Sequence, residues 1–317
     1  MAEKTIGRHL IPLFMSDADL AAKSQATADT YRKALNQFFL FLETEAAAKG
    51  KDPKELWDPQ PLDVKKFRDS LKNANPPKSA ITITSYLTAV RKFFAWAHAA
   101  GIHKDVAKNV KGVPMDKEHE RKGFLTAEQV RTVLEAIDTS DEAGKRNYAL
   151  VYLMVTTGLL GIEIERARVG DIKEYDDKNI LHVQGKGKHD KNDYVLMPEE
   201  THKRLQEYFS CRIGQNGETP LFTSLGDTGS GDPLCTRAMR NIVKKCFAAV
   251  GIKDDYMSSQ SLRDTAGMLA LINNESVKDV QKYLRHNDLE STLVYARHAA
   301  KLENTCADTV AEAIRTA

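Results

Sequence analysis

The chain has 317 residues with 42% hydrophobic and 28% charged side chains, a length and composition typical of a globular protein with two domains. Its formal net charge of +2 neither indicates nor excludes a nucleic-acid-binding protein. Its four cysteines form no CxxC pair, and this spacing argues against a zinc site or a disulfide scaffold. Because no apolar run approaches the ~20 residues that span a bilayer and no small-residue cleavage site follows the N-terminus, we expect a cytoplasmic protein.

Residues 1–112 are predicted to form a helical domain. Apolar residues recur at helical spacing over 27–47 and 81–101, and a shorter helix is expected over 62–73, before Asn75 and two prolines. A segment with a proline, glycines and dense mixed charge follows, and we interpret 113–124 as an exposed linker.

Residues 125–317 are predicted to form a second domain. Thr126 and Gln129 have the spacing of a capping box, and the apolar segment 147–158 predicts a buried helix that ends at Gly158. Two alternating runs flank a tip rich in glycine and lysine, which indicates one β-hairpin. The expected fold class is therefore mainly α with a small β-hairpin. Further helices are expected over 198–212, 236–251, 261–274, 276–286 and 300–317.

Three polar clusters in the second domain stand in a defined order. They are Gly185-Lys186-Gly187-Lys188 at the hairpin tip, Gln260–Thr265, and Leu284-Arg285-His286, and Tyr295 follows them. From Arg263 to His286 is 23 residues, and from His286 to Tyr295 is 9. This order and spacing resemble the tyrosine recombinases, also called lambda-type integrases or Xer-like recombinases, whose pattern runs TGLR, GKG, HxLRH, LGH and Tyr. The resemblance covers nearly the whole chain and implies a SAM-like helical core-binding domain followed by a catalytic domain.

The resemblance implies that the protein cleaves and rejoins DNA through a 3′-phosphotyrosyl intermediate, without metal or cofactor. Tyr295 would be the nucleophile, and Arg263 would hold the phosphate oxygens with its bidentate guanidinium. His286 would donate to the phosphate or manage the nucleophile's proton. Lys186, or alternatively Lys188, would protonate the departing 5′ oxygen. Each residue also has an ordinary structural reading, as a half-buried tyrosine, a helix-surface arginine, a helix-end histidine or a solvated turn lysine.

The sequence departs from the family pattern at three positions. Leu160 stands where the family has arginine, although Glu163 follows at the family's distance. Gln260 replaces a His or Lys, and can still donate a hydrogen bond to phosphate but carries no charge. Asp264 replaces a frequent second His. Loss of one positioned donor typically lowers a rate by ~10²–10³, so we expect reduced activity unless another cation substitutes. The candidates for that substitution are Arg166, Arg168, Arg237 and Arg240.

The resemblance also implies partners. We expect double-stranded DNA to be gripped by both domains, and a homo-tetramer on two DNA segments to be linked by the C-terminal tail, which packs in trans. The DNA-binding candidates are Lys188, Arg32, Lys33, Arg91, Lys92, Arg237 and Arg240. Accessory DNA-bending factors are further candidate partners, no membrane partner is expected, and the location is expected to be nucleoid-associated. Integration or excision of a mobile element is the expected role. The alternatives are a DNA-binding accessory recombinase subunit with impaired catalysis and a type IB topoisomerase.

Overall fold

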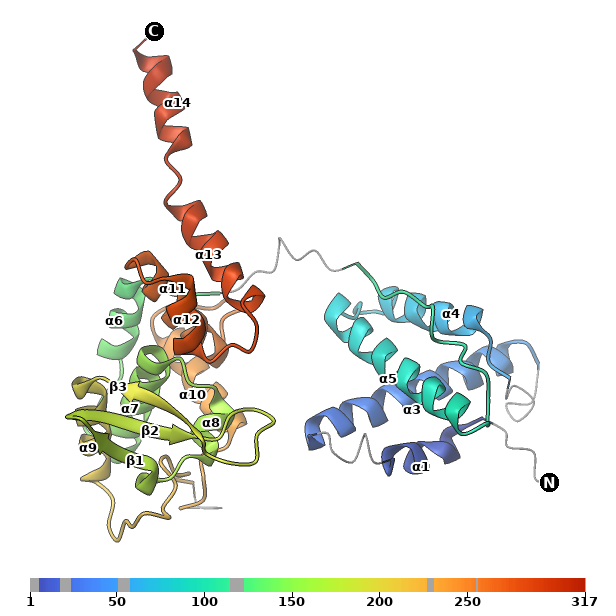
Figure 1. Ribbon diagram of the computed structural model, residues 1–317, viewed down its shortest axis with the longest axis horizontal. Coiled ribbons are helices and arrows are strands. Elements are labelled where there is room, and N and C mark those ends of the chain that lie inside the picture. Colours follow the sequence, from blue (N-terminus) through green and yellow to red (C-terminus); the bar gives the residue numbers. More distant parts are fainter. Residues whose placement is uncertain are drawn as a thin grey trace. The chain divides into compact units, whose positions relative to one another are not determined.

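The computed structural model describes residues 6–17, 24–50, 58–114, 123–226, 231–254 and 256–316, and it is mainly helical with one small sheet, as predicted (Figure 1). The chain divides into two compact units, Met1–Glu120 and Arg121–Ala317. Residues 115–122 of the predicted linker lie outside the described residues. None of the described helices is both long and apolar enough to cross a membrane.

The first unit is built from helices that bury a cluster of phenylalanines. Its described elements are η1 (Arg8–Leu10), α1 (Ile11–Met15), α3 (Gln25–Ala48), α4 (Pro61–Lys72) and α5 (Ala80–Ala99). Ser24 and Ser79 cap α3 and α5 through their side chains. The rings of Phe38 and Phe67 meet edge-on with centroids 5.2 Å apart, and Phe94 lies 5.8 Å from Phe38. The helices predicted in this unit are confirmed, whereas η1 and α1 were missed.

The second unit is organised around the buried helix α7. Its described helical elements are α6 (Ala127–Glu135), α7 (Glu142–Thr157), α8 (Gly161–Arg166), η3 (Val169–Asp171), α9 (Glu199–Phe209), α10 (Thr236–Ala249), α11 (Ser259–Ile272), α12 (Val277–Leu284), α13 (Glu290–Leu302) and α14 (Cys306–Arg315). The capping box at Thr126 is confirmed, and α9 and α11 both pack against α7. Helix α7 ends, as predicted, at Gly158 in the left-handed conformation with φ 61°. A Cβ at Gly158 would lie 2.6 Å from Leu284 Cδ2, so a larger residue would force the Leu284 side chain to shift, and the positive φ favours glycine as well.

A three-stranded antiparallel sheet lies in the second unit, in the order β1-β2-β3. It comprises β1 (Ile172–Tyr175), β2 (Lys178–Val183) and β3 (Asp193–Met197). The predicted hairpin is confirmed, with Val183 paired to Asp193 at its open tip. The sequence pattern missed β1, because the residues of this edge strand after Ile172 are all exposed and carry no alternating signal.

The C-terminal region consists of two helices rather than the predicted single helix over 300–317. Helix α13 ends at Leu302, and α14 begins at Cys306. All side chains of α14 are exposed, including Val310 and Ile314 at 59% and 73%. Figure 1 shows α14 at the end of the chain, beyond α13. The apolar side chains Leu302, Val310 and Ile314 of this tail are therefore exposed in the single chain.

Candidate active site

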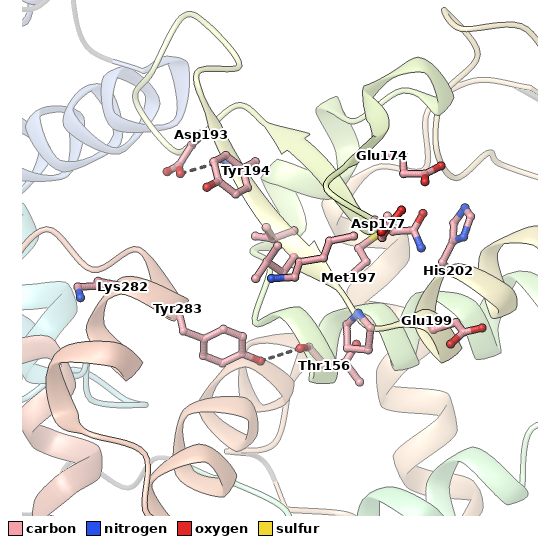
Figure 2. A pocket seen from close by; sticks show the side chains of 15 residues that line it. Thr156, Glu174, Asp177, Asp193, Tyr194, Met197, Glu199, His202, Lys282 and Tyr283 are labelled. Carbon is pink, nitrogen blue, oxygen red and sulfur yellow. Dashed lines mark hydrogen bonds between the residues drawn. The ribbon is translucent and has the colours of Figure 1, made fainter.

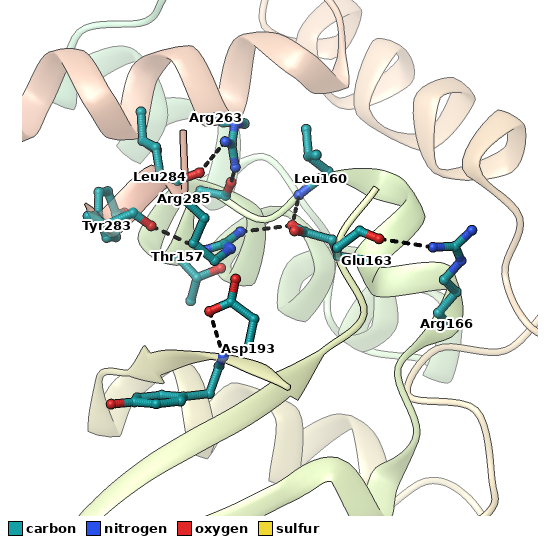
Figure 3. Close-up of polar contacts among 12 residues, drawn as sticks. Thr157, Leu160, Glu163, Arg166, Asp193, Arg263, Tyr283, Leu284 and Arg285 are labelled. Carbon is teal, nitrogen blue, oxygen red and sulfur yellow. Dashed lines mark hydrogen bonds and ion pairs between the residues drawn. The ribbon is translucent and has the colours of Figure 1, made fainter. Parts of the chain in front are cut away.

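Arg263 lies at the junction of three helices. It belongs to the first turns of α11, which begins after the Ser258 cap, and it is 5% exposed. Its Nη1 donates to the carbonyl of Gly158 at the end of α7, and its Nη2 donates to the carbonyl of Leu284 at the end of α12 (Figure 3). A cation at two helix C-termini is electrostatically favoured. Burial lowers the pKa of Arg263, and the positive charge of Arg285 lowers it further.

The predicted nucleophile, Tyr295, lies on α13, which the sequence analysis did not predict as a helix. The residue is 2% exposed, and its Oη donates to Asp264 Oδ1 at 2.7 Å. Gln260 Nε2 donates to the same oxygen at 3.3 Å. A Cβ at Gly267 would lie 2.9 Å from Leu284 Cδ1 and 3.5 Å from the Tyr295 ring. Glycine at this position therefore allows α11 to approach α12 and α13 closely.

His286 stacks against Tyr295, the predicted nucleophile. Its ring lies 6.0 Å from the Tyr295 ring, centroid to centroid, with an interplanar angle of 15°. Its Nδ1 shares a hydrogen bond of 2.8 Å with Thr292 Oγ1, and Thr292 is fully buried. These two contacts fix the orientation of the imidazole. Three predicted site residues, Arg263, His286 and Tyr295, thus belong to the consecutive helical segments α11, α12 with its C-terminal turn, and α13.

A second buried guanidinium, which the sequence analysis missed, belongs to Arg285. The side chain is 10% exposed, and its Nη2 lies 2.8 Å from Glu163 Oε2. Its Nη1 donates to the carbonyl of Tyr283 at 3.1 Å. Its Nε is buried without a hydrogen-bond partner among the described residues. The signal for this residue was present, since Arg285 stands at the glycine of the family's LGH motif.

Leu160 is the N-cap of α8 and is half-buried. Its backbone N–H donates to Glu163 Oε2 at 2.7 Å. That oxygen is the same one that accepts from Arg285, as Figure 3 shows. The carboxylate of Glu163 is buried, with Glu163 3% exposed. It therefore links Leu160, where the family has arginine, to Arg285 at the end of α12.

The hairpin tip carries the two candidate lysines. Both Lys186 and Lys188 are exposed. Lys188 Nζ lies 3.6 Å from Asp193 Oδ2, an ion pair at the end of the hairpin where the tip loop joins β3. Arg166, on α8, donates from Nη1 to the carbonyl of Gly185 at 3.2 Å and so connects the hairpin to the helix that follows Leu160.

The other predicted basic residues differ in what they contact. Lys33, Lys92, Arg237 and Arg240 are exposed. Arg32 is exposed and pairs with Asp29 at 2.8 Å. Arg91 is half-buried, and its Nε and Nη2 donate to the carbonyl of Val110. Arg168 donates its backbone N–H to Asp171 Oδ2.

A pocket of about 1210 Å³ opens beside this site and is distinct from it. Tyr283 forms part of its wall and donates its hydroxyl to the Thr156 carbonyl at 2.8 Å (Figure 2). Its lining includes the carboxylates of Glu174, Asp177, Asp193 and Glu199. Lys178 and Lys282 also line it, whereas Arg263 and Tyr295 do not, so the chemistry expected of those two residues does not belong to this pocket.

The arrangement around Tyr295 is suited to attack on an anionic centre. A phenol close to a carboxylate can lose its proton as it forms a bond. Two guanidiniums, of Arg263 and Arg285, can stabilise negative charge on phosphate oxygens, especially in a buried setting. The exposed hairpin lysines can supply a proton to a leaving group.

Comparisons with known proteins identify the family of the chain. Residues 123–301 match the phage integrase family, and residues 14–101 match the phage integrase N-terminal SAM-like domain. The tyrosine recombinase XerD of Lacticaseibacillus casei is 25% identical over 276 residues, covering 86% of this chain and 87% of that protein. The tyrosine recombinase XerC of Corynebacterium glutamicum is 27% identical over 226 residues, covering 71% and 70%.

Solved structures show the same fold. The XerH site-specific recombinase in its post-cleavage complex with a palindromic difH substrate gives a TM-score of 0.70 at 18% identity, covering 90% of this chain and 80% of that chain. A lambda integrase dimer bound to a COC′ core site gives 0.65 at 14% identity, covering 89% and 95%. These matches do not favour the accessory-subunit or topoisomerase alternatives. The chain belongs to the phage integrase family and is a tyrosine recombinase.

Proposed function

We propose that this protein is a site-specific recombinase that cleaves and rejoins double-stranded DNA through a 3′-phosphotyrosyl bond at Tyr295. The observation that carries the proposal is the set of groups around Tyr295. Its ring stacks on the imidazole of His286, and its hydroxyl interacts electrostatically with the guanidinium of Arg263. A tyrosine surrounded in this way by a carboxylate, an imidazole and guanidiniums has the groups that phosphoryl transfer requires.

In the proposed reaction, the Tyr295 oxygen forms a bond to the scissile phosphorus, and the bond from phosphorus to the 5′ oxygen breaks. Asp264 is the nearest proton acceptor for the phenol, at 2.7 Å. Arg263 uses two of its five N–H groups on backbone carbonyls, which leaves donors for the phosphate. Gln260 contributes a neutral donor. Rejoining reverses these steps with a new 5′ hydroxyl.

Lys186 is the proposed acid for the departing 5′ oxygen. Lys188 pairs with Asp193, whereas the described residues provide no ion-pair partner for Lys186. An exposed lysine at a hairpin tip can reach the DNA when the hairpin meets the duplex. This difference in pairing supports Lys186 over Lys188.

We further propose that both units bind the duplex and that four protomers assemble on two DNA segments. The N-terminal unit offers the exposed Lys33 and Lys92, and α10 offers Arg237 and Arg240. The uncovered apolar residues of α14 support a contact with a neighbouring protomer. Integration or excision of a mobile element in the nucleoid, assisted by DNA-bending factors, remains the proposed biological setting.

The test is covalent capture on a nicked duplex that loses its 5′ fragment after cleavage, here called the suicide substrate, which carries the protein's own recombination site. The unaltered protein should form an adduct that withstands denaturation. Tyr295→Phe should form none, while its affinity for the same duplex stays within about threefold, since one hydroxyl contributes little to phosphate-dominated binding. An adduct that persists in Tyr295→Phe would refute the assignment, and a protein that binds the site without any adduct would be an accessory subunit.

A further inference from the structure

Arg285 has the features of a residue held ready for an anion. Its side chain is nine-tenths buried and is oriented by Glu163 on one side and by the Tyr283 carbonyl on the other. A guanidinium has five N–H groups, and these two hydrogen bonds leave the Nε–H unpaired in a buried position. An unpaired buried donor is unfavourable, so it indicates a partner that is present only at another stage of the reaction.

The backbone at Arg285 adds a second, independent observation. The residue adopts φ 56° and ψ 42°, the left-handed conformation, at the C-terminus of α12. Side chains with a Cβ rarely adopt this conformation, and glycine is the residue that does so freely. Strain of this kind persists at functional sites, so the guanidinium is the part of this residue that the site needs.

The positive charge of Arg285 lies next to Leu160, the position where the family has an arginine and this chain has no charge. Glu163 Oε2 accepts from the backbone of Leu160 and from the side chain of Arg285. Arg285 also lies close enough to Arg263 to lower its pKa, second only to the effect of burial. Arg285 therefore brings its charge beside Leu160 and close to the guanidinium of Arg263.

The arginines first considered as substitutes have other environments. Arg166 donates to the Gly185 carbonyl at the hairpin, and Arg237 and Arg240 lie exposed on α10. Among Arg166, Arg168, Arg237, Arg240 and Arg285, only Arg285 is joined to Glu163 by an ion pair in the described part of the chain.

We propose that Arg285 is a catalytic residue that binds a non-bridging oxygen of the scissile phosphate together with Arg263, and that it replaces the arginine absent at position 160. The inference rests on the proposed phosphotyrosyl chemistry at Tyr295. As the bond from Tyr295 to phosphorus forms and the bond to the 5′ oxygen breaks, Arg285 neutralises charge on the phosphate. It neither gives nor takes a proton.

The first experiment measures single-turnover cleavage of the suicide substrate by Arg285→Gly. Glycine accommodates the left-handed backbone but leaves the Glu163 carboxylate without its ion-pair partner, so the variant is first shown to be folded by circular dichroism. Its cleavage rate should fall ~10²–10³-fold, as for loss of one transition-state donor. Arg285→Lys keeps a charge but lacks the bidentate fork, and should lose about tenfold or more. Arg297→Ala removes an exposed arginine of α13 that pairs with Glu290, and serves as the matched control with a rate within about twofold.

The second experiment separates contact with the phosphate from a structural role. The suicide substrate is remade with a methylphosphonate at the scissile position, which replaces one charged oxygen by a methyl group. The rate ratio between the unaltered protein and Arg285→Gly should then be at least about tenfold smaller on methylphosphonate than on phosphate. The reason is that the methylphosphonate carries less negative charge for Arg285 to neutralise. An unchanged ratio on the two substrates would assign Arg285 a structural role and overturn the inference.

The third experiment moves the arginine. Leu160→Arg alone should change the rate by less than about threefold, because a second guanidinium is already present. Leu160→Arg combined with Arg285→Gly should recover cleavage to within about tenfold of the unaltered protein.

The outcomes separate the inference from the proposed function. Arg285→Gly and Arg285→Lys that both cleave within about threefold of the unaltered protein would refute the inference while leaving Tyr295 in place. An unaltered protein that forms no adduct at all would refute the proposed function and the inference with it.

Discussion

The Oη of Tyr295 donates a 2.7 Å hydrogen bond to Oδ1 of Asp264, and both residues are at least nine-tenths buried. The family pattern often has a histidine at position 264, so Tyr295, the proposed nucleophile, faces a carboxylate instead. A carboxylate within hydrogen-bond distance of a phenol is placed to accept its proton during attack.

Asp264→Asn tests this role. The amide oxygen of asparagine can accept the same hydrogen bond but cannot take the proton, so adduct formation should slow by ~10²–10⁴-fold with little change in the free energy of unfolding. Rates are measured by single-turnover cleavage of the suicide substrate. Asp288→Asn is the matched control, because Asp288 Oδ1 accepts from the backbone N–H of Ser291 in the first turn of α13, and an asparagine oxygen can accept the same bond. An Asp264→Asn variant as fast as the unaltered protein would mean that the carboxylate only holds the tyrosine.

Neighbouring basic residues on α5 should differ in their effect on DNA binding. Lys92 is exposed, so Lys92→Ala should weaken DNA binding and reduce the slope of log affinity against log salt by about 1. Arg91 donates to the Val110 carbonyl, so Arg91→Ala should lower the free energy of unfolding by about 1–3 kcal/mol instead. Affinities across a salt series and urea unfolding measure the two effects. Equal salt slopes for Lys92→Ala and the unaltered protein would remove Lys92 from the DNA interface.

The apolar side of α14 should be needed for assembly but not for binding of one site. Val310→Gln with Ile314→Gln should preserve the affinity for a single duplex and weaken the pairing of two duplexes by about a hundredfold, the effect of leaving two apolar side chains uncovered. Glu312→Gln, on the same helix, is the control. Pairing is measured with two differently labelled duplexes. Unchanged pairing in the double variant would place the protomer contact elsewhere.

Burial raises the pKa of Tyr283 to about 12, which predicts a stability effect at high pH. The folded state keeps the proton more tightly than the unfolded chain, whose tyrosines titrate near pH 10, so this contribution is present below about pH 10 and is lost as pH rises toward 12. At about pH 8, Tyr283→Phe should cost ~1 kcal/mol through loss of the bond to the Thr156 carbonyl. By about pH 10.5 the difference from the unaltered protein should have nearly vanished. Urea unfolding at both pH values checks this, and a difference independent of pH would contradict it.

Local signals in the sequence were sufficient for much of the fold. Helix α7 is apolar on most faces and ends at Gly158, and the capping box at Thr126 is formed by adjacent residues, so neither depends on distant contacts. Strand β1 was missed because an exposed edge strand owes its structure to pairing with β2 rather than to its own pattern. The tail was predicted as one helix because periodicity does not reveal the break after Leu302.

The site was predictable only as far as the motif residues. Spacing identified Arg263, His286 and Tyr295 as candidates, and the structure brings them together. Arg285 stands at a motif position, but its role was overlooked because its relation to Leu160 spans 125 positions and appears only when the end of α12 meets α8 at Glu163. The contact of Asp264 with Tyr295 likewise depends on how α13 packs against α11, which no local pattern encodes.

The left-handed backbone of Arg285 also constrains the order in which this site could have diverged from the family pattern. Loss of the arginine at position 160 before a gain at 285 would leave the buried carboxylate of Glu163 without a cation, at a cost of several kcal/mol. A gain at 285 first costs only the backbone strain of about 1–2 kcal/mol, and one carboxylate can accept from two guanidiniums. If position 160 once held an arginine, these energies favour a gain at 285 before the loss at 160.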